Sequence, residues 1–283
     1  MRGALFVAVY AVPGRASLPG TRGGGMNRAN RLTAILDLLA VRGDVSVEEL
    51  AERFDASAAT IRRDLDSLSE RRLLTRTHGG AVAQSVAYEL PIRYKSHQRT
   101  SQKERIAQAA SALVSPGAVV GLSGGTTTTA IATALAARED LAEQGLTVVT
   151  NAVNIAAQLA TRPDFKVVVT GGVIHSRSYE LVGPFVEQLL AGVSLDIAFI
   201  GVNALSTSGV ATTHDEREAA VNRMMASRAR RAVIVADSSK VGASAFAAVG
   251  GSDLFPTLLT DDGLAPDDRN ALREAGYEVV LAD

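Results

Sequence analysis

One short segment combines the residue types that bind an anion. It follows an apolar run and reads Ser123, Gly124, Gly125, Thr126, Thr127. The two glycines let the backbone approach an anion, the hydroxyls add donors, and a helix beginning here would point its N–H groups at the same place. No lysine follows the glycines as in a nucleotide-binding P-loop, so ATP hydrolysis is not expected. The segment predicts an anion-binding loop, with a plain strand-to-helix turn as the alternative.

The elements around this loop alternate between helical and apolar patterns from residue 101 onward. A helix is predicted at 101–114, and apolar strands are predicted at 118–122, 146–150, 166–170, 196–201, 232–236, 257–260 and 278–281. Such alternation predicts an α/β domain with a largely parallel sheet covered on both faces. Ligands of such sheets bind beyond the C-terminal ends of the strands.

Polar residues and glycines recur at these strand ends. The further ligand-binding candidates are Thr150, Asn151, Gly171, Gly172, Asp215, Glu218 and Lys240. Lys240 would supply a charge to a phosphate, or be an exposed loop lysine. Asp215 and Glu218 open a helix, where acids favour the positive end of the helix dipole. The alternative for these two acids is that they bind sugar hydroxyls.

Residues 26–83 have a different pattern, with short helices predicted at 30–41, 47–53 and 58–70. Ser46 and Ser57 are expected to cap the second and third helices, with Glu49 reaching back to complete a capping box. A hairpin follows, with strands at 73–77 and 81–83.

This order of elements predicts a winged helix-turn-helix that binds double-stranded DNA. A helix with small residues and arginines near its N-terminus can enter the major groove. The candidate DNA contacts are Ser57, Ala59, Thr60, Arg62 and Arg63 on the helix and Arg72, Arg76 and His78 on the hairpin. Taken alone, the two adjacent arginines also fit the solvated face of an ordinary amphipathic helix.

Charge and composition agree with this division. Residues 26–99 carry a formal charge of +2 and residues 100–283 carry −6, as expected for a DNA-binding head on an acidic body. The chain has no cysteine, which excludes disulfides, thiolate zinc sites and cysteine nucleophiles and fits a cytoplasmic protein. The four histidines lack metal-ligand spacing, so neither a metal nor a cofactor is expected.

The two remaining segments are not expected to fold into domains. Residues 1–25 contain an apolar run at 4–12 that is too short to cross a bilayer, followed by a stretch rich in Gly, Pro and Arg. We interpret them as a disordered tail or a spurious upstream start before Met26, with a signal peptide as the alternative; no membrane partner is expected. Residues 84–100 are interpreted as a linker.

Two motifs make the first domain recognisable. From Phe54 to Leu68 the chain reads FxxSxxTIRRDLxxL, and from Arg76 to Ala81 it reads RxHGGA. These motifs resemble the signature of the DeoR family of bacterial transcriptional repressors. The resemblance implies a winged helix-turn-helix acting at a DNA operator. Asp64 is then expected to fix an arginine or to cap locally, not to contact a base.

The resemblance extends to about residue 262 through GTT at 125–127, TN at 150–151, GG at 171–172, DSSK at 237–240 and TD at 260–261. It implies a sensor domain (101–283) similar in fold to ribose-5-phosphate isomerase, glucosamine-6-phosphate deaminase and CoA-transferases. The implied effector is a phosphorylated sugar or related metabolite. Many members of the family carry Asp where this chain has Ser123, which leaves the identity of the sugar open.

The resemblance therefore implies a repressor of a sugar-metabolism operon, acting as a homodimer or homotetramer and released from DNA by its effector. No catalytic residue is expected in such a protein. The alternative is an isomerase or deaminase, which needs a carboxylate base on the sugar. Asp215 and Glu218 are the candidates for that base.

Overall fold

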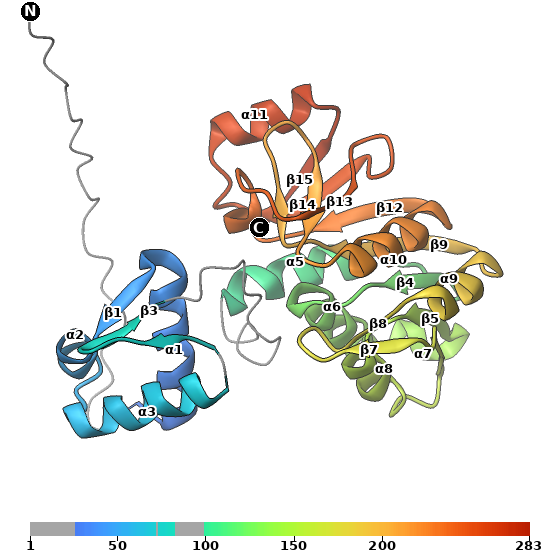
Figure 1. The fold of residues 1–283 in the computed structure, drawn as a ribbon. Coiled ribbons are helices and arrows are strands. Elements are labelled where there is room, and N and C mark those ends of the chain that lie inside the picture. Colours follow the sequence, from blue (N-terminus) through green and yellow to red (C-terminus); the bar gives the residue numbers. More distant parts are fainter. Residues whose placement is uncertain (1–25, 72, 83–98) are drawn as a thin grey trace, which may run out of the picture. The chain divides into compact units, whose positions relative to one another are not determined.

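The structure is a computed structural model that describes residues 26–71, 73–82 and 99–283 (Figure 1). The chain divides into two compact units, Met1–Ala83 and Gln84–Asp283, and each is considered by itself. The predictions made for residues 1–25, for Arg72 and for residues 84–98 lie outside the described residues. No helix in the described ranges is both long and apolar enough to cross a membrane.

The described residues of the first unit, 26–71 and 73–82, form three helices and a small antiparallel sheet. The elements are α1 (Arg28–Arg42), β1 (Asp44–Ser46), α2 (Val47–Arg53), α3 (Ala58–Glu70), β2 (Thr75–Arg76) and β3 (Gly80–Val82). The strand order is β1-β3-β2, with both pairs antiparallel. Ile61, Leu65 and Leu68 of α3 are fully buried, as their helical spacing predicts.

The helix ends follow from local chemistry. Gly43 ends α1 with a φ of +84°, which only glycine adopts freely. The hydroxyl of Ser46 accepts from the backbone N–H of Glu49 at 3.1 Å, and that of Ser57 accepts from Thr60 at 3.1 Å. Both predicted N-caps are confirmed. The Glu49 carboxylate pairs with Arg42 on α1.

The wing differs in detail from the prediction. The strand expected at 73–77 covers only β2, because Leu73 and Leu74 are buried in the core instead. Gly80, expected in the turn, begins β3 and pairs with Ser46. Strand β1 was not predicted, since three residues between two helices carry too little periodicity to reveal a strand.

The second unit is built on a seven-stranded parallel sheet. Its strands are β4 (Val119–Leu122), β5 (Leu146–Thr150), β6 (Phe165–Val169), β9 (Leu195–Gly201), β12 (Ala229–Val235), β14 (Thr257–Asp261) and β15 (Glu278–Ala282). The order across the sheet is β15-β14-β12-β9-β4-β5-β6, and every pair is parallel. The predicted parallel α/β fold is confirmed.

This strand order contains a topological switch point. From β4 the chain adds β5 and β6 on one side, and it then returns to add β9, β12, β14 and β15 on the other. The crevice beyond the carboxyl ends of β4 and β9 is therefore the place where such sheets bind ligands. Ser123 follows β4, and Gly201 ends β9.

Helices cover both faces of the sheet, which places one hydrophobic core on each side. One core includes α5 (Thr100–Ala112), α6 (Thr126–Ala136), α7 (Asp140–Gln144) and α8 (Val153–Leu159). The other includes α9 (Pro184–Ala191), α10 (Glu216–Ser227) and α11 (Pro266–Glu274). The helix predicted at 101–114 ends earlier, at Ala112, and Leu113 after it is 39% exposed.

The smaller antiparallel elements were not predicted. Strands β7 (Val173–His175) and β8 (Glu180–Val182) form a hairpin, and β10 (Ala204–Leu205), β11 (Ala211–Thr213) and β13 (Ala247–Gly250) form a separate sheet. Each has two to four residues, too few for a strand-like alternation of apolar and polar residues. They matter because the β7–β8 hairpin lies against the switch point.

Candidate functional site

The switch point is closed by contacts between the ends of β4 and β9. The Ser123 side chain is fully buried, and its hydroxyl accepts from the N–H of Gly201 at 2.9 Å. A Cβ on Gly201 would lie 2.9 Å from the carbonyl oxygen of Gly124, closer than carbon approaches oxygen in real structures. Glycine at 201 and a hydroxyl at 123 thus let the two strand ends meet.

The loop after β4 leads into α6 through Gly125, whose φ of +121° favours glycine. No side chain in the described part of the chain caps the N-terminus of α6. The hydroxyls of Thr128 and Thr129 turn back to donate to the Gly125 carbonyl at 3.0 and 2.7 Å. Backbone N–H groups at a helix N-terminus are suited to binding an anion, and the anion-binding role of this loop stays a prediction.

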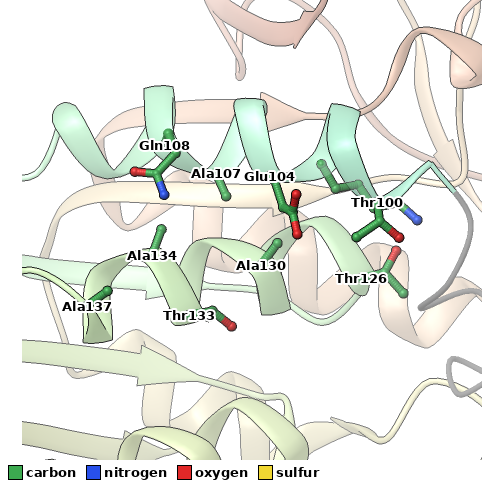
Figure 2. Close-up of a pocket in the computed structure, with 10 residues that line it drawn as sticks. Thr100, Glu104, Ala107, Gln108, Thr126, Ala130, Thr133, Ala134 and Ala137 are labelled. Atoms are coloured by element: carbon green, nitrogen blue, oxygen red, sulfur yellow. The ribbon is translucent and has the colours of Figure 1, made fainter.

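A cavity of about 380 Å³ lies between α5 and α6 (Figure 2). The two helices run side by side with their N-termini at the same end, where Thr100 and Thr126 lie close to each other. Lys103 also lines this cavity and is only 6% exposed. Two helix N-termini and a buried ammonium group make this end of the cavity suitable for a phosphate.

Sequence reasoning missed Thr100 and Lys103. A usable signal was present, because Lys103 occupies the inward-facing stripe of α5 at helical spacing from Ile106, Ala107 and Ala110. Lysine is rarely buried unless an anionic or polar group pairs with it, so a lysine in this stripe is a signal of a polar site. Thr126 is the predicted residue that lines the same cavity.

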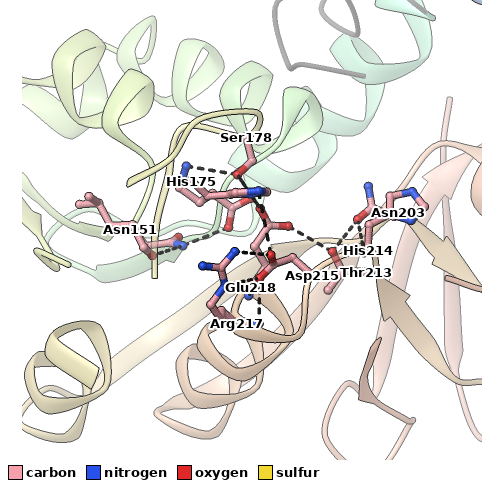
Figure 3. A network of polar contacts seen from close by, with 11 residues as sticks. Asn151, His175, Ser178, Asn203, Thr213, His214, Asp215, Arg217 and Glu218 are labelled. Atoms are coloured by element: carbon pink, nitrogen blue, oxygen red, sulfur yellow. Dashed lines mark hydrogen bonds and ion pairs between the residues drawn. The ribbon is translucent and has the colours of Figure 1, made fainter. Parts of the chain in front are cut away.

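A second polar group lies under the β7–β8 hairpin (Figure 3). Its centre is Glu218 of α10, which is 2% exposed. Oε1 of Glu218 accepts from the hydroxyl of Ser178 at 2.5 Å and lies 2.6 Å from Nδ1 of His175. The Thr213 hydroxyl lies 3.3 Å from Oε2. The hairpin is thereby fixed to the start of α10.

Asp215, the other predicted acid, caps α10. Its Oδ1 accepts from the backbone N–H groups of Arg217 and Glu218 at 2.9 and 3.3 Å, and Oδ2 lies 2.6 Å from Nη2 of Arg217. The hydrogen bond from the Arg217 side chain, aided by those two N–H groups, keeps the pKa of Asp215 below its usual value despite partial burial. The capping interpretation accounts for this residue without a ligand.

Asn151 and Glu180 complete the polar surroundings of Gly124. Asn151 is fully buried, and its Nδ2 donates to Oε2 of Glu180 at 3.0 Å and to the carbonyl of Leu181 at 3.2 Å. A Cβ on Gly124 would lie 2.2 Å from Cγ of Glu180. The space beside Gly124, where the sequence predicts an anion, is thus filled by the Glu180 side chain.

The remaining candidates take positions around this centre. Thr150 uses its hydroxyl to donate to the Leu122 carbonyl at 2.7 Å, which joins β5 to β4. Gly171 and Gly172 precede β7 with φ values of +74° and +115°. Lys240 ends the short 3₁₀ helix η1 (Ser238–Lys240) after β12. Thr127 is 8% exposed on α6. Their contacts with a ligand stay predictions.

The candidate nucleic-acid interface is the exposed face of α3. Ser57, Ala59, Arg62 and Arg63 are exposed, while Thr60 is partly buried and its hydroxyl lies 2.9 Å from that of Ser57. The turn between β2 and β3 exposes His78. These six predicted residues therefore remain available to DNA.

Two other charged residues of this unit are already paired. Nε of Arg76 lies 3.0 Å from Asp66 of α3, and its Nη1 donates to the Gly80 carbonyl at 2.6 Å, so Arg76 ties the wing to the helix. Asp64 is 2% exposed and binds Arg28 and Arg31 of α1. The prediction that Asp64 fixes an arginine is confirmed. Within the described ranges, no cluster of three or more acidic or histidine side chains could hold a metal ion.

Comparison with known proteins agrees with both units. Residues 31–86 match the DeoR-like helix-turn-helix domain, and residues 98–262 match the DeoR C terminal sensor domain. The chain belongs to the DeoR family. The family resemblance predicted from the sequence is therefore confirmed.

Several curated DeoR-like relatives match over nearly their whole length. The chain is 32% identical over 236 residues to the glycerol-3-phosphate regulon repressor of Escherichia coli (strain K12), covering 83% of this chain and 92% of the relative. It is 35% identical over 253 residues to the HTH-type transcriptional regulator GlpR of Haloferax volcanii, covering 89% and 97%. It is 32% identical over 247 residues to the HTH-type transcriptional repressor CsqR of E. coli, covering 87% and 93%.

Among solved structures, the full-length sorbitol operon regulator SorC from Klebsiella pneumoniae matches with a TM-score of 0.40 and 13% identity, covering 86% of this chain and 98% of that one. Ribose 5-phosphate isomerase A from Methanocaldococcus jannaschii matches with a TM-score of 0.39 and 19% identity, covering 51% and 55%.

Proposed function

We propose that this DeoR-family protein is a DNA-binding repressor of a sugar-metabolism operon, and that a phosphorylated sugar or related metabolite controls its affinity for the operator. Curated relatives that match over most of their length are named as repressors, one of them of a glycerol-3-phosphate regulon. The exposed arginines on α3 supply the DNA-binding surface.

One observation carries the effector proposal. The N-termini of α5 and α6 converge at one end of a cavity of about 380 Å³, where the nearly buried Lys103 also lies. Both helix dipoles are positive at this end, and the hydroxyls of Thr100 and Thr126 add donors. The volume lies in the usual range for small-molecule sites. We therefore place the phosphate of the effector at this end of the cavity. The rest of the effector then faces the switch point.

The effector acts by shifting an equilibrium between two states of the protein. It can do so only to the extent that it binds one state more tightly than the other. A helix-turn-helix protein reads two half-sites of a palindrome with two heads, so the active form is a homodimer or a homotetramer. We propose that the effector favours the state whose heads no longer match the operator spacing, which releases the DNA. Its place of action is the cytoplasm, where the operator is.

The protein is proposed to bind its sugar phosphate without converting it. The two carboxylates considered as bases are engaged by the chain, since Glu218 is held by His175 and Ser178 while Asp215 caps α10. Incubation with sugar phosphates should leave them unchanged by NMR. Measurable isomerisation or deamination would instead favour the enzyme.

The effector site is tested with a DNA fragment selected by the full chain from a random pool. Fluorescence anisotropy measures the affinity for this DNA and its loss as sugar phosphates are added. Lys103→Gln and Thr126→Val should raise the effector concentration needed for half-release by about tenfold or more, with DNA affinity unchanged. Lys166→Gln removes an exposed lysine from β6 and should behave as wild type. A wild-type response in both site variants would overturn the proposed phosphate site.

Lys240 is tested in the same assay. If its ammonium group reaches the phosphate, Lys240→Ala should weaken the response as Lys103→Gln does. If only Lys103→Gln weakens the response, the phosphate lies at the α5–α6 end and Lys240 has another role.

A further inference from the structure

The buried side-chain amide of Asn151 has hydrogen-bond partners for its nitrogen but none among the described residues for its oxygen. Its Nδ2 faces two acceptors, Oε2 of Glu180 and the carbonyl of Leu181, which fixes the orientation of the amide. Oδ1 is consequently turned elsewhere, and it has no hydrogen-bond partner among the described residues although Asn151 is fully buried. A buried acceptor without a donor is unfavourable, so this position calls for a donor from outside the chain.

A second amide on the other side of the switch point repeats this pattern. Asn222 of α10 is 3% exposed, and its Nδ2 donates to the Gly201 carbonyl at 3.5 Å. Its Oδ1 also lacks a partner among the described residues. Gly201 lies against Gly124, so the two free amide oxygens belong to residues that flank the same loop.

The carboxylate of Glu180 adds a third acceptor at this loop. Glu180 is 5% exposed, and the position that a Gly124 Cβ would occupy lies 2.4 Å from its Oε1. Acceptors therefore concentrate at Gly124, while donors concentrate at Thr100, Lys103 and Thr126. Only one residue separates Gly124 from Thr126, so their Cα atoms are at most about 7 Å apart. A ligand with a short carbon chain spans the two ends.

We propose that Glu180, Asn151 and Asn222 read the end of the effector opposite its phosphate and require that end to donate hydrogen bonds. This inference rests on the proposed function and narrows its ligand class. Hydroxyl groups of an aldose or polyol phosphate satisfy the free amide oxygens. A phosphorylated sugar acid instead brings a carboxylate against Glu180, where like charges repel in a partly desolvated site.

The test uses pairs of phosphates that differ only in whether the far end is a hydroxyl-bearing carbon or a carboxylate. Glycerol 3-phosphate is paired with 3-phosphoglycerate, and glucitol 6-phosphate with 6-phosphogluconate. Binding to the full-length protein is measured by calorimetry and by release of the selected DNA. In at least one pair the hydroxyl member should bind at least about tenfold more tightly.

Glu180→Gln keeps the shape of the side chain and removes its charge. It should narrow the preference within that pair to below about threefold, mainly by tighter binding of the acid. Glu187→Gln removes the same charge from an exposed position on α9 and should keep the wild-type preference. Thermal unfolding checks that each variant is folded, and the wild-type preference tests the inference even without a folded variant.

The outcomes separate this inference from the function on which it rests. If both members of each pair bind equally well and Lys103→Gln weakens them equally, the phosphate site stands and the selection by Glu180 is wrong. A preference that Glu180→Gln leaves unchanged also overturns the role of Glu180. If no phosphate in either pair binds or releases DNA, the proposed function fails and this inference fails with it.

Discussion

Asp64 of α3 and Arg31 of α1 form a nearly buried ion pair, with 2.6 Å between Oδ2 and Nε. Asp64 is 2% exposed, and its second oxygen lies 3.3 Å from Nε of Arg28. The pair joins the first helix to the one that carries the candidate DNA contacts. Asp64 lies on the buried side of α3 with Ile61 and Leu68, where it holds the helix against α1. Arg62 and Arg63, which precede it, are exposed.

Replacing Asp64 by alanine should destabilise the first unit by about 3 kcal/mol, because Arg31 is left largely buried without its carboxylate. DNA affinity should fall with it as α3 loses its anchor. Asp66→Ala is the matched control, since Asp66 is exposed and its contact with Arg76 should contribute less than about 1 kcal/mol. Urea unfolding and anisotropy with the selected DNA measure both effects. Equal unfolding free energies for the two variants would contradict the positioning role.

Two adjacent glycines in the wing should respond differently to the same substitution. A Cβ on Gly80 would lie 1.9 Å from the Val45 carbonyl oxygen, whereas one on Gly79 would meet nothing within 4 Å. Gly80→Ala should therefore separate β3 from β1, while Gly79→Ala should be tolerated. Hydrogen exchange at the β1 and β3 amides measures the difference. Slow exchange preserved in Gly80→Ala would show that β3 and β1 are farther apart at this position.

Arg62→Ala and Arg63→Ala should each weaken operator binding by about tenfold without changing effector binding. If the removed arginine contacts a phosphate, the salt dependence of binding should become weaker, whereas if it contacts a base edge, the sequence preference at one position should relax. Arg273→Ala is the control, because it removes the same charge from an exposed position on α11 and should leave DNA affinity unchanged. Anisotropy at several salt concentrations distinguishes the two roles. Unchanged affinity in both variants would remove α3 as the DNA-reading element.

The parts of the fold with strong periodicity could be predicted from the sequence. Helix α3 has the predicted bounds, because Ser57 provides a local cap and the apolar residues Ile61, Leu65 and Leu68 recur at helical spacing. Strand β5 is likewise a run of apolar residues ended by polar ones. Both signals are local, so one segment is enough to reveal them.

The site depended more on contacts between distant residues. The loop at Gly124 and Thr126 was found from its composition, but Glu180, which packs on Gly124, lies on a hairpin too short to be recognised. Lys103 was missed because its relation to Thr126 arises only when α5 packs beside α6. Residue type predicted the chemistry of the loop, and tertiary packing decided which other side chains share the site.

Tyr277 makes stability depend on pH in the alkaline range. It is 3% exposed, and its hydroxyl donates to the Gly209 carbonyl at 2.8 Å. Burial, with a smaller effect of the nearby Asp253 charge, raises the pKa of Tyr277 to about 12 from its ordinary value of 10. The folded state therefore holds this proton at pH values where the unfolded chain has released it.

The sign of the effect follows from this difference. The contribution of the neutral phenol to stability is fully present below pH 10 and is lost as the pH rises toward about 12. Across that window the free energy of unfolding of the wild type should fall by up to roughly 3 kcal/mol more than that of Tyr277→Phe, which has no phenolic proton to lose. Urea unfolding at several pH values measures the difference between the two proteins. Because Tyr277 is one of five tyrosines in the chain, its own titration is the difference in phenolate absorbance between the wild type and Tyr277→Phe. Parallel pH dependence in both proteins would contradict the raised pKa.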